Sequence, residues 1–378
     1  MKEKHPSIHI ELLRCIACFL VIFNHTAYSV RNIVPGDLSK SRIVTLLLYF
    51  FCKTAVPLFL LIAGANLLNK KDTPQKTFKR IRKIIALIII GSLPYLFTDN
   101  ISIFSSEYWI GLYEGNYNAS IWYLYLYLGI LLMLPLLQSI HLSAKQHLYL
   151  LLVYLFGPGL FPLLRIYFSI PAPAAPLYYA IPSCYVILLL TGDYLENKID
   201  LRELTAKRIA GIWAVLVFSV GISFITAIHQ LNTIGYIDYD SVYGTTYYSF
   251  TVSISICTYL LVRYYFHSIR TGIIKATILQ FGKYTLGIYL FGEFIRVRLE
   301  FLYDYLKANM SHLLSVLIYS VCIFITGAFI MFIFYSAKNI YTKKDKVSLI
   351  FFRCSNLSFR LLLHKSYHSF QLCGVYVQ

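Results

Sequence analysis

The sequence predicts an all-α, polytopic membrane protein with about ten transmembrane helices and both termini in the cytoplasm. Of its 378 residues, 58% are hydrophobic and 13% are charged, whereas soluble globular proteins carry about 25% charged residues. The deficit of charge extends along the whole chain, and long apolar runs recur as far as about residue 336. These two observations exclude a soluble multidomain protein.

The individual spans follow from apolar runs of about 20 residues, the length that crosses a bilayer. In order, they cover approximately residues 10–30, 43–68, 84–98, 120–137, 147–164, 178–195, 209–228, 246–266, 280–298 and 313–336. The first run lacks a small-residue cleavage site and is long enough to span. We therefore interpret it as a membrane helix and not as a cleavable signal peptide.

The basic residues set the predicted orientation. The formal net charge is +17, and with a cytoplasmic N-terminus most Lys and Arg residues fall in inner connections, above all between residues 70 and 83. The outer loops 99–119 and 229–245 contain no Lys or Arg. This bias predicts cytoplasmic termini. Because topology accounts for the excess charge, we expect membrane lipid as a partner and no nucleic acid.

The chain is predicted to form one membrane domain, residues 1–338, followed by a basic cytoplasmic tail, residues 339–378, without a catalytic role. The connections between spans are too short to fold alone. The tail loses the long apolar runs and has no acidic residue after Asp345. Cys15 and Cys18 have CxxC spacing, but they lie on a predicted membrane helix without other nearby ligands, so we expect no metal site.

Ionisable side chains at membrane depth are costly, which makes each one a hypothesis of function. They are Arg14, His25, Lys53, Glu293 and Arg296. His25 is the one histidine well inside a predicted span, and a neutral imidazole can act as a general base. The alternative is a packed histidine that bonds a neighbouring backbone carbonyl.

Arg14 is related to His25 by helix geometry. The two are separated by eleven helical steps, which bring them to nearly the same face and about 16 Å apart. Arg14 could contact a ligand, extend to lipid phosphate, or pair with Glu11 three residues earlier. These alternatives stay open from the residues alone.

Two further clusters combine charge with helical spacing. The segment 70–85 contains seven basic residues before a span, and Arg80 and Lys83 share a helix face from which they can grip one polyanion. The alternative is attraction to anionic lipid. Glu293 and Arg296 have the same spacing, which suits either a structural ion pair or a supporting role in a site.

Three segments in the first quarter of the chain, which include Arg14, His25, Arg80 and Lys83, resemble segments of the acyltransferase family 3 integral membrane proteins. "RCIACFLVIFNH", from Arg14 to His25, is similar to that family's first-helix pattern of a basic residue, ten residues and a histidine. "VPLFLLIAGANLL" resembles its second helix, with Ala63 in place of the usual serine. "KRIRKII" resembles its arginine-x-x-arginine pattern, with Lys83 in the second position.

Two later segments extend the resemblance over about residues 8–336. "IWYLYLYLGILLMLPLL", residues 121–137, is similar to the family's tryptophan–tyrosine–leucine span. "YTLGIYLFGEF", residues 284–294, resembles its late "GIYL" segment, although many members have a histidine where this chain has Gly292 and Glu293.

The resemblance implies an O-acyltransferase that moves an acyl group, expected to be acetyl, from acyl-coenzyme A to a hydroxyl of an extracytoplasmic glycan. It implies His25 as the catalytic base, either by direct transfer or through an acyl-histidine. It further implies that the donor's phosphates or pantetheine contact Arg14, Arg80 and Lys83. No bound cofactor is expected, and the expected location is a bacterial plasma membrane.

Two other functions stay open from the sequence. One is a proton-coupled transporter or flippase of a lipid-linked sugar, with His25, Lys53 and Glu293 as a proton relay. The other is a structural membrane subunit of a polysaccharide export complex. Turnover of acyl-coenzyme A distinguishes the acyltransferase from both of them.

Overall fold

The computed structural model describes residues 7–26, 33, 35–36, 38–98, 101–117, 121–169, 181–237, 248–269 and 272–337. The regular elements in these ranges are helices, and no strand occurs among them, which confirms the predicted all-α class. The predicted cytoplasmic tail, residues 339–378, lies outside the described residues.

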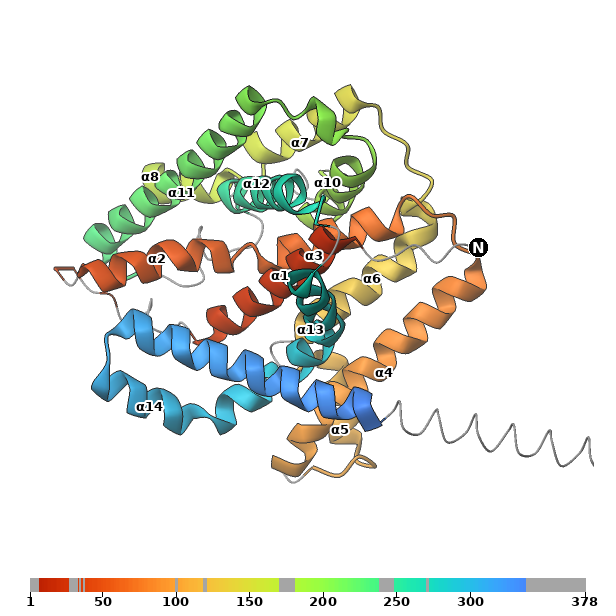
Figure 1. The fold of residues 1–378 in the computed structure, drawn as a ribbon, viewed down its shortest axis with the longest axis vertical. Coiled ribbons are helices and arrows are strands. Elements are labelled where there is room, and N and C mark those ends of the chain that lie inside the picture. Colours follow the sequence, from red (N-terminus) through yellow and green to blue (C-terminus); the bar gives the residue numbers. More distant parts are fainter. Residues whose placement is uncertain are drawn as a thin grey trace, which may run out of the picture. The chain divides into compact units, whose positions relative to one another are not determined.

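The helices are labelled in Figure 1. They are α1 (Ile8–Thr26), α2 (Lys40–Cys52), α3 (Ala55–Leu67), α4 (Pro74–Thr98), α5 (Ser106–Glu114), α6 (Trp122–Leu137), α7 (Ala144–Phe156), α8 (Phe161–Phe168), α10 (Cys184–Asn197), α11 (Ala206–Ile234), α12 (Ser249–Phe266), α13 (Ile273–Arg298) and α14 (Glu300–Asn309), with a 3₁₀ turn at Leu201–Glu203. A further helix covers His312–Ala337. The chain divides into two compact units, residues 1–328 and 329–378, and the description below concerns the first.

Within the described ranges, five helical segments are long and apolar enough to cross a membrane. They are Ile8–Thr26, Lys40–Leu67, Ala144–Phe168, Ala206–Ile234 and His312–Ala337. These segments support a membrane protein. The other predicted spans also fall on helices, but the total of about ten spans and the cytoplasmic termini stay predictions.

The predicted span at 43–68 is divided into α2 and α3 by a turn at Lys53 and Thr54. Pro57, three residues into α3, has no N–H to bond the Lys53 carbonyl, and its ring clashes with that carbonyl in a continuous helix. The helix therefore breaks four residues before the proline. This break places the side chain of Lys53 in the interior, where the residue is only 6% exposed.

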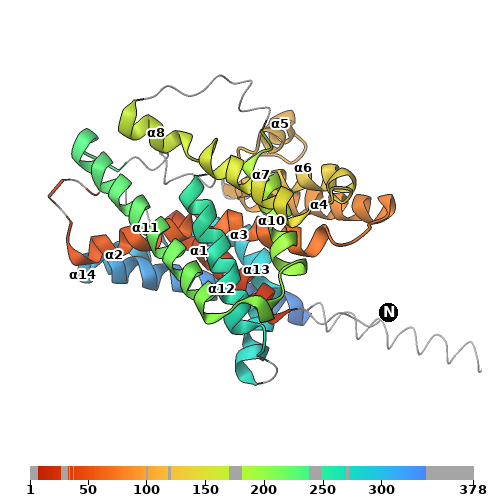
Figure 2. The ribbon, with the colours of Figure 1, turned by 90° about the horizontal axis from the view of Figure 1, so that it is seen from above.

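Helix α1 packs against α13, α3, α12 and α2, and both views place it among α3, α12 and α13 (Figure 1, Figure 2). Leu13, Ala17 and Cys18 are fully buried along its length. Since Ala17 and Cys18 are small, neighbouring backbones can approach closely there, as is usual where membrane helices pack. Residues on α1 consequently face side chains from several distant parts of the chain.

The closest helix contact joins α3 and α10 through two glycines. A Cβ atom on Gly64 would overlap the backbone oxygen of Leu189, and a Cβ atom on Gly192 would overlap that of Leu61. Only hydrogen atoms fit at either position. This reciprocal contact fixes α3, which in turn packs on α1.

Candidate active site

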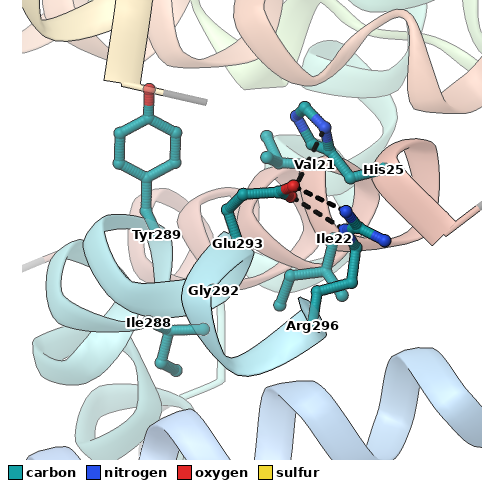
Figure 3. Close-up of a pocket in the computed structure, with 8 residues that line it drawn as sticks. All are labelled: Val21, Ile22, His25, Ile288, Tyr289, Gly292, Glu293 and Arg296. Atoms are coloured by element: carbon teal, nitrogen blue, oxygen red, sulfur yellow. Dashed lines mark hydrogen bonds and ion pairs between the residues drawn. The ribbon is translucent and has the colours of Figure 1, made fainter. Parts of the chain in front are cut away.

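The packing of α1 against α13 brings together His25 and Glu293, two ionisable residues that the sequence predicted at membrane depth. His25 lies in the last turn of α1, and its Nδ1 atom is 3.8 Å from Oε2 of Glu293. Arg296 donates two hydrogen bonds to the Glu293 carboxylate, with Nε and Nη2 at 3.0 and 2.8 Å from its oxygens. The carboxylate thus lies between an imidazole and a guanidinium (Figure 3).

These three side chains line one small pocket. Its other lining residues are Val21, Ile22, Ile288, Tyr289 and Gly292. The side chains of His25, Glu293 and Arg296 are 29%, 17% and 11% exposed, so the imidazole is the most accessible of the three. The wall is otherwise apolar, a setting in which the charges interact more strongly than in water.

Lys53 extends this charged group. Its charge acts on His25 together with the charges of Glu293 and Arg296. The ammonium lies 4.5 Å from the centre of the Tyr49 ring, in a cation–π contact. The sequence analysis identified Lys53 as ionisable at membrane depth and placed it in the proton relay of the transporter alternative, but not among the site residues of the acyltransferase. Pro57, which marks the helix break, was the signal that could have placed it there.

A row of aromatic rings leads away from the pocket. Tyr289 lines the pocket, and its ring centroid is 6.4 Å from that of Tyr123, which is 6.1 Å from that of Tyr127. Phe59 contacts both Tyr289 and Tyr123, at 6.3 and 5.5 Å. These four residues are called the aromatic row below. They come from α3, α6 and α13, and the i,i+4 spacing of the two α6 tyrosines puts them on one helix face.

The far end of the aromatic row lies near two of the three predicted donor residues. The charges of Arg14 and Arg80 both act on the Tyr127 phenol. Arg14 donates a hydrogen bond of 2.6 Å to Glu11, so the internal pair allowed by the sequence is present. Arg80 is hydrogen-bonded to Asp72, whose side chain is fully buried.

Lys83, the third predicted donor residue, is exposed on α4, whereas Arg80 is partly buried. Both residues lie on the predicted helix, but they differ in environment. The Arg80 side chain is held by its hydrogen bond to Asp72. The structure therefore brings Arg14 and Arg80 to one end of the aromatic row and His25, Glu293 and Arg296 to the other.

The comparison with protein families identifies the family of this chain. The family model described as an acyltransferase domain matches residues 8–358, which is most of the chain and includes every predicted site residue. The chain belongs to the acyltransferase 3 family. This membrane acyltransferase matches no curated protein and no solved structure. The resemblance in the sequence is thereby confirmed at the level of the family.

Proposed function

We propose that this acyltransferase moves an acyl group, expected to be acetyl, from acyl-coenzyme A to a hydroxyl group of an extracytoplasmic glycan. The observation that carries the proposal is the aromatic row, which links the pocket of His25 to the arginines Arg14 and Arg80. Arginine suits phosphate groups because it binds them with two parallel hydrogen bonds. A thioester on the flexible pantetheine arm would then extend along the row toward the imidazole.

In the proposed reaction, neutral His25 accepts the proton of the acceptor hydroxyl. The oxygen attacks the thioester carbonyl carbon, a C–O bond forms, and the C–S bond breaks. The imidazolium returns its proton to the departing thiolate, so free coenzyme A and the O-acylated glycan are the products. If His25 attacks the thioester first, a C–N bond forms, the C–S bond breaks and coenzyme A leaves as the thiolate, which gives an acyl-histidine. The hydroxyl oxygen then attacks the acyl carbon, the C–N bond breaks, and the hydroxyl proton passes to the thiolate.

Glu293 is assigned as a positioning residue in this reaction. Its carboxylate lies 3.8 Å from the imidazole and is held by two hydrogen bonds from Arg296. A carboxylate in this position orients the ring and stabilises the imidazolium that forms during proton transfer. The charge of Lys53 acts on His25, and we assign it to stabilising the oxyanion of the tetrahedral intermediate, because a fixed cation near that oxygen lowers the barrier.

The test of this function is mass spectrometry of surface glycans from cells with and without the gene. Loss of an acyl group from one glycan hydroxyl, together with acyl-coenzyme A turnover by the purified protein, is the expected result. The alternative function, a proton-coupled transporter or flippase, draws on the same grouping of Lys53, Glu293 and His25. Transport requires no turnover of acyl-coenzyme A. If the purified protein does not turn over acyl-coenzyme A, the transport function is favoured.

The proposal requires that the donor and the acceptor arrive from opposite sides of the membrane. We therefore propose about ten membrane spans, with both termini in the cytoplasm. The basic N-terminal end of α4 is then on the cytoplasmic side of the membrane, and α5 is on the outer side. Lys79 and Tyr113 are both exposed and serve as labelling positions. An impermeant thiol reagent added outside is expected to label Tyr113→Cys but not Lys79→Cys, with the unmodified chain as the background control. The reverse pattern would contradict the topology and the cross-membrane mechanism.

The donor assignment predicts a graded loss of acyl-coenzyme A affinity. Arg80→Ala and Arg14→Ala are expected to weaken binding about tenfold or more, because each removes a charged hydrogen-bonding partner. Lys83→Ala is expected to weaken it less, since Lys83 is exposed and screened by solvent. Added salt should weaken binding by the wild-type protein. Isothermal titration or filter binding measures the effect.

Arg202→Ala is the matched control, because Arg202 is exposed and pairs with Asp200. Its donor affinity should equal that of the wild type. Unchanged affinity in Arg14→Ala and Arg80→Ala would remove the donor assignment, and the basic segment would then be interpreted as a lipid contact.

A further inference from the structure

Asp72 is an acidic residue within the most basic segment of the chain, and its carboxylate is fully buried. It lies in the connection between α3 and α4. One carboxylate oxygen is 2.5 Å from the Lys76 ammonium, and the other accepts a hydrogen bond from Arg80. Both oxygens are therefore engaged by cations that would otherwise be available to an external anion.

The connection that carries Asp72 is held against the end of α6. The Asp72 backbone N–H donates to the side chain of Gln138 at 3.2 Å, and Gln138 donates to the Leu67 carbonyl at 2.8 Å. Burial acts to raise the pKa of Asp72, but hydrogen bonds and charge from Lys76 and Arg80 outweigh it and hold that pKa below its usual value. Asp72 is thus ionised at neutral pH.

The charges of Asp72, Lys76 and Arg80 nearly cancel. One carboxylate and two cations leave a single net positive charge, which is small compared with the several negative charges on the phosphates of coenzyme A. Arg80 can bind a phosphate in full only if it exchanges Asp72 for the ligand. An internal carboxylate that must be displaced lowers the affinity for the donor and, equally, eases the departure of spent coenzyme A.

Glu11, the partner of Arg14, differs from Asp72 in its surroundings. Glu11 lies within helix α1, and a Cβ atom on Gly282 of α13 would overlap its carboxylate, so the residue is enclosed by packed helices. Asp72 lies on a connection outside any helix. Of the two carboxylates, Asp72 is the one that is not enclosed between packed helices.

We propose that Asp72 is an internal competitor that occupies Arg80 in place of a polyphosphate and so sets the affinity for the donor. The proposal rests on the assignment of Arg80 to donor binding. Asp72 is then a residue that determines donor affinity: each time the donor binds, one of its phosphates replaces the Asp72 carboxylate as the partner of Arg80. It does not give Asp72 any contact with the reacting atoms.

Asp72→Asn tests the exchange without disturbing the start of α4. That helix begins beyond Thr73, whose hydroxyl accepts from the Lys76 N–H at 3.4 Å and whose carbonyl accepts from the Thr77 N–H at 3.1 Å. The contact between Gln138 and residue 72 uses a backbone N–H and is retained. Asparagine keeps the shape but not the charge.

The experiment measures binding of inorganic pyrophosphate and, separately, of coenzyme A to the full-length protein in detergent. Asp72→Asn is expected to bind both about three- to tenfold more tightly than the wild type, because a competing charge is lost. In an Arg80→Ala background the same substitution should give a smaller gain, because only Lys76 is then released from Asp72. Asp200→Asn, which neutralises an exposed aspartate paired with Arg202, is the control and should change neither affinity.

Equal or weaker pyrophosphate binding by Asp72→Asn would overturn the proposal, as would a gain of the same size in the Arg80→Ala background. Failure of every variant to bind pyrophosphate would overturn it too. A gain with pyrophosphate but no binding of coenzyme A by any variant would retain the competitor role and contradict the donor assignment. The two failures are therefore distinguishable.

Discussion

His25→Gln is expected to reduce glycan acylation by a factor of about 10²–10⁴, the usual cost of removing a positioned general base. Glutamine keeps much of the size and some of the hydrogen bonding of histidine, but it cannot accept a proton at neutral pH. The side chain of His25 is 29% exposed in a pocket shared with Glu293 and Arg296. The substitution therefore removes the proposed chemistry and leaves the packing of α1 largely unchanged.

The measurement is acyl transfer by purified, folded variants, alongside donor binding. His25→Gln should still bind acyl-coenzyme A, because Arg14 and Arg80 lie at the other end of the aromatic row. His147→Gln is the matched control, since His147 is a buried histidine outside the pocket that stacks on Tyr194 with ring centroids 4.5 Å apart. Near wild-type acylation by His25→Gln would contradict the assignment of His25 as the catalytic base and would favour the transporter hypothesis.

The residues of the pocket could be selected from the sequence because ionisable groups are rare at membrane depth. His25 and Glu293 were both identified on that basis. Their contact could not be predicted, because it depends on which helices pack together. The residue pattern of a uniformly apolar helix does not indicate which other helix packs against it. Small residues such as Ala17 and Cys18 indicate only that some close neighbour exists.

Other features were hidden by the composition of the chain. Aromatic residues make up 17% of the sequence, so nothing distinguished Tyr123 and Tyr127 from the rest. Asp72, among seven basic residues, has the sequence pattern of a solvated loop. Its carboxylate is covered where it pairs with Lys76 and Arg80, and the connection that carries it is held on the end of α6 by Gln138, a contact that local sequence does not encode.

Gly192→Ala is expected to destabilise the fold by about 1–3 kcal/mol or more, the usual range for overpacking. The added Cβ would overlap the backbone oxygen of Leu61, and a backbone atom cannot rotate away as a side chain can. Helices α3 and α10 must therefore separate. Gly192→Leu, with a larger side chain at the same place, should yield no folded protein.

Gly129→Ala is the matched control, because a Cβ atom at Gly129 on α6 meets nothing within 4 Å. Alanine there should be neutral or stabilising by up to about 1 kcal/mol through helix propensity. Thermal unfolding in detergent compares the variants, and an unchanged melting temperature for Gly192→Ala would contradict the α3–α10 contact. Because α3 also carries Phe59 and packs on α1, its displacement should reach the aromatic row. Folded Gly192→Ala protein is therefore expected to lose acyl transfer as well as stability, whereas Gly129→Ala should retain both.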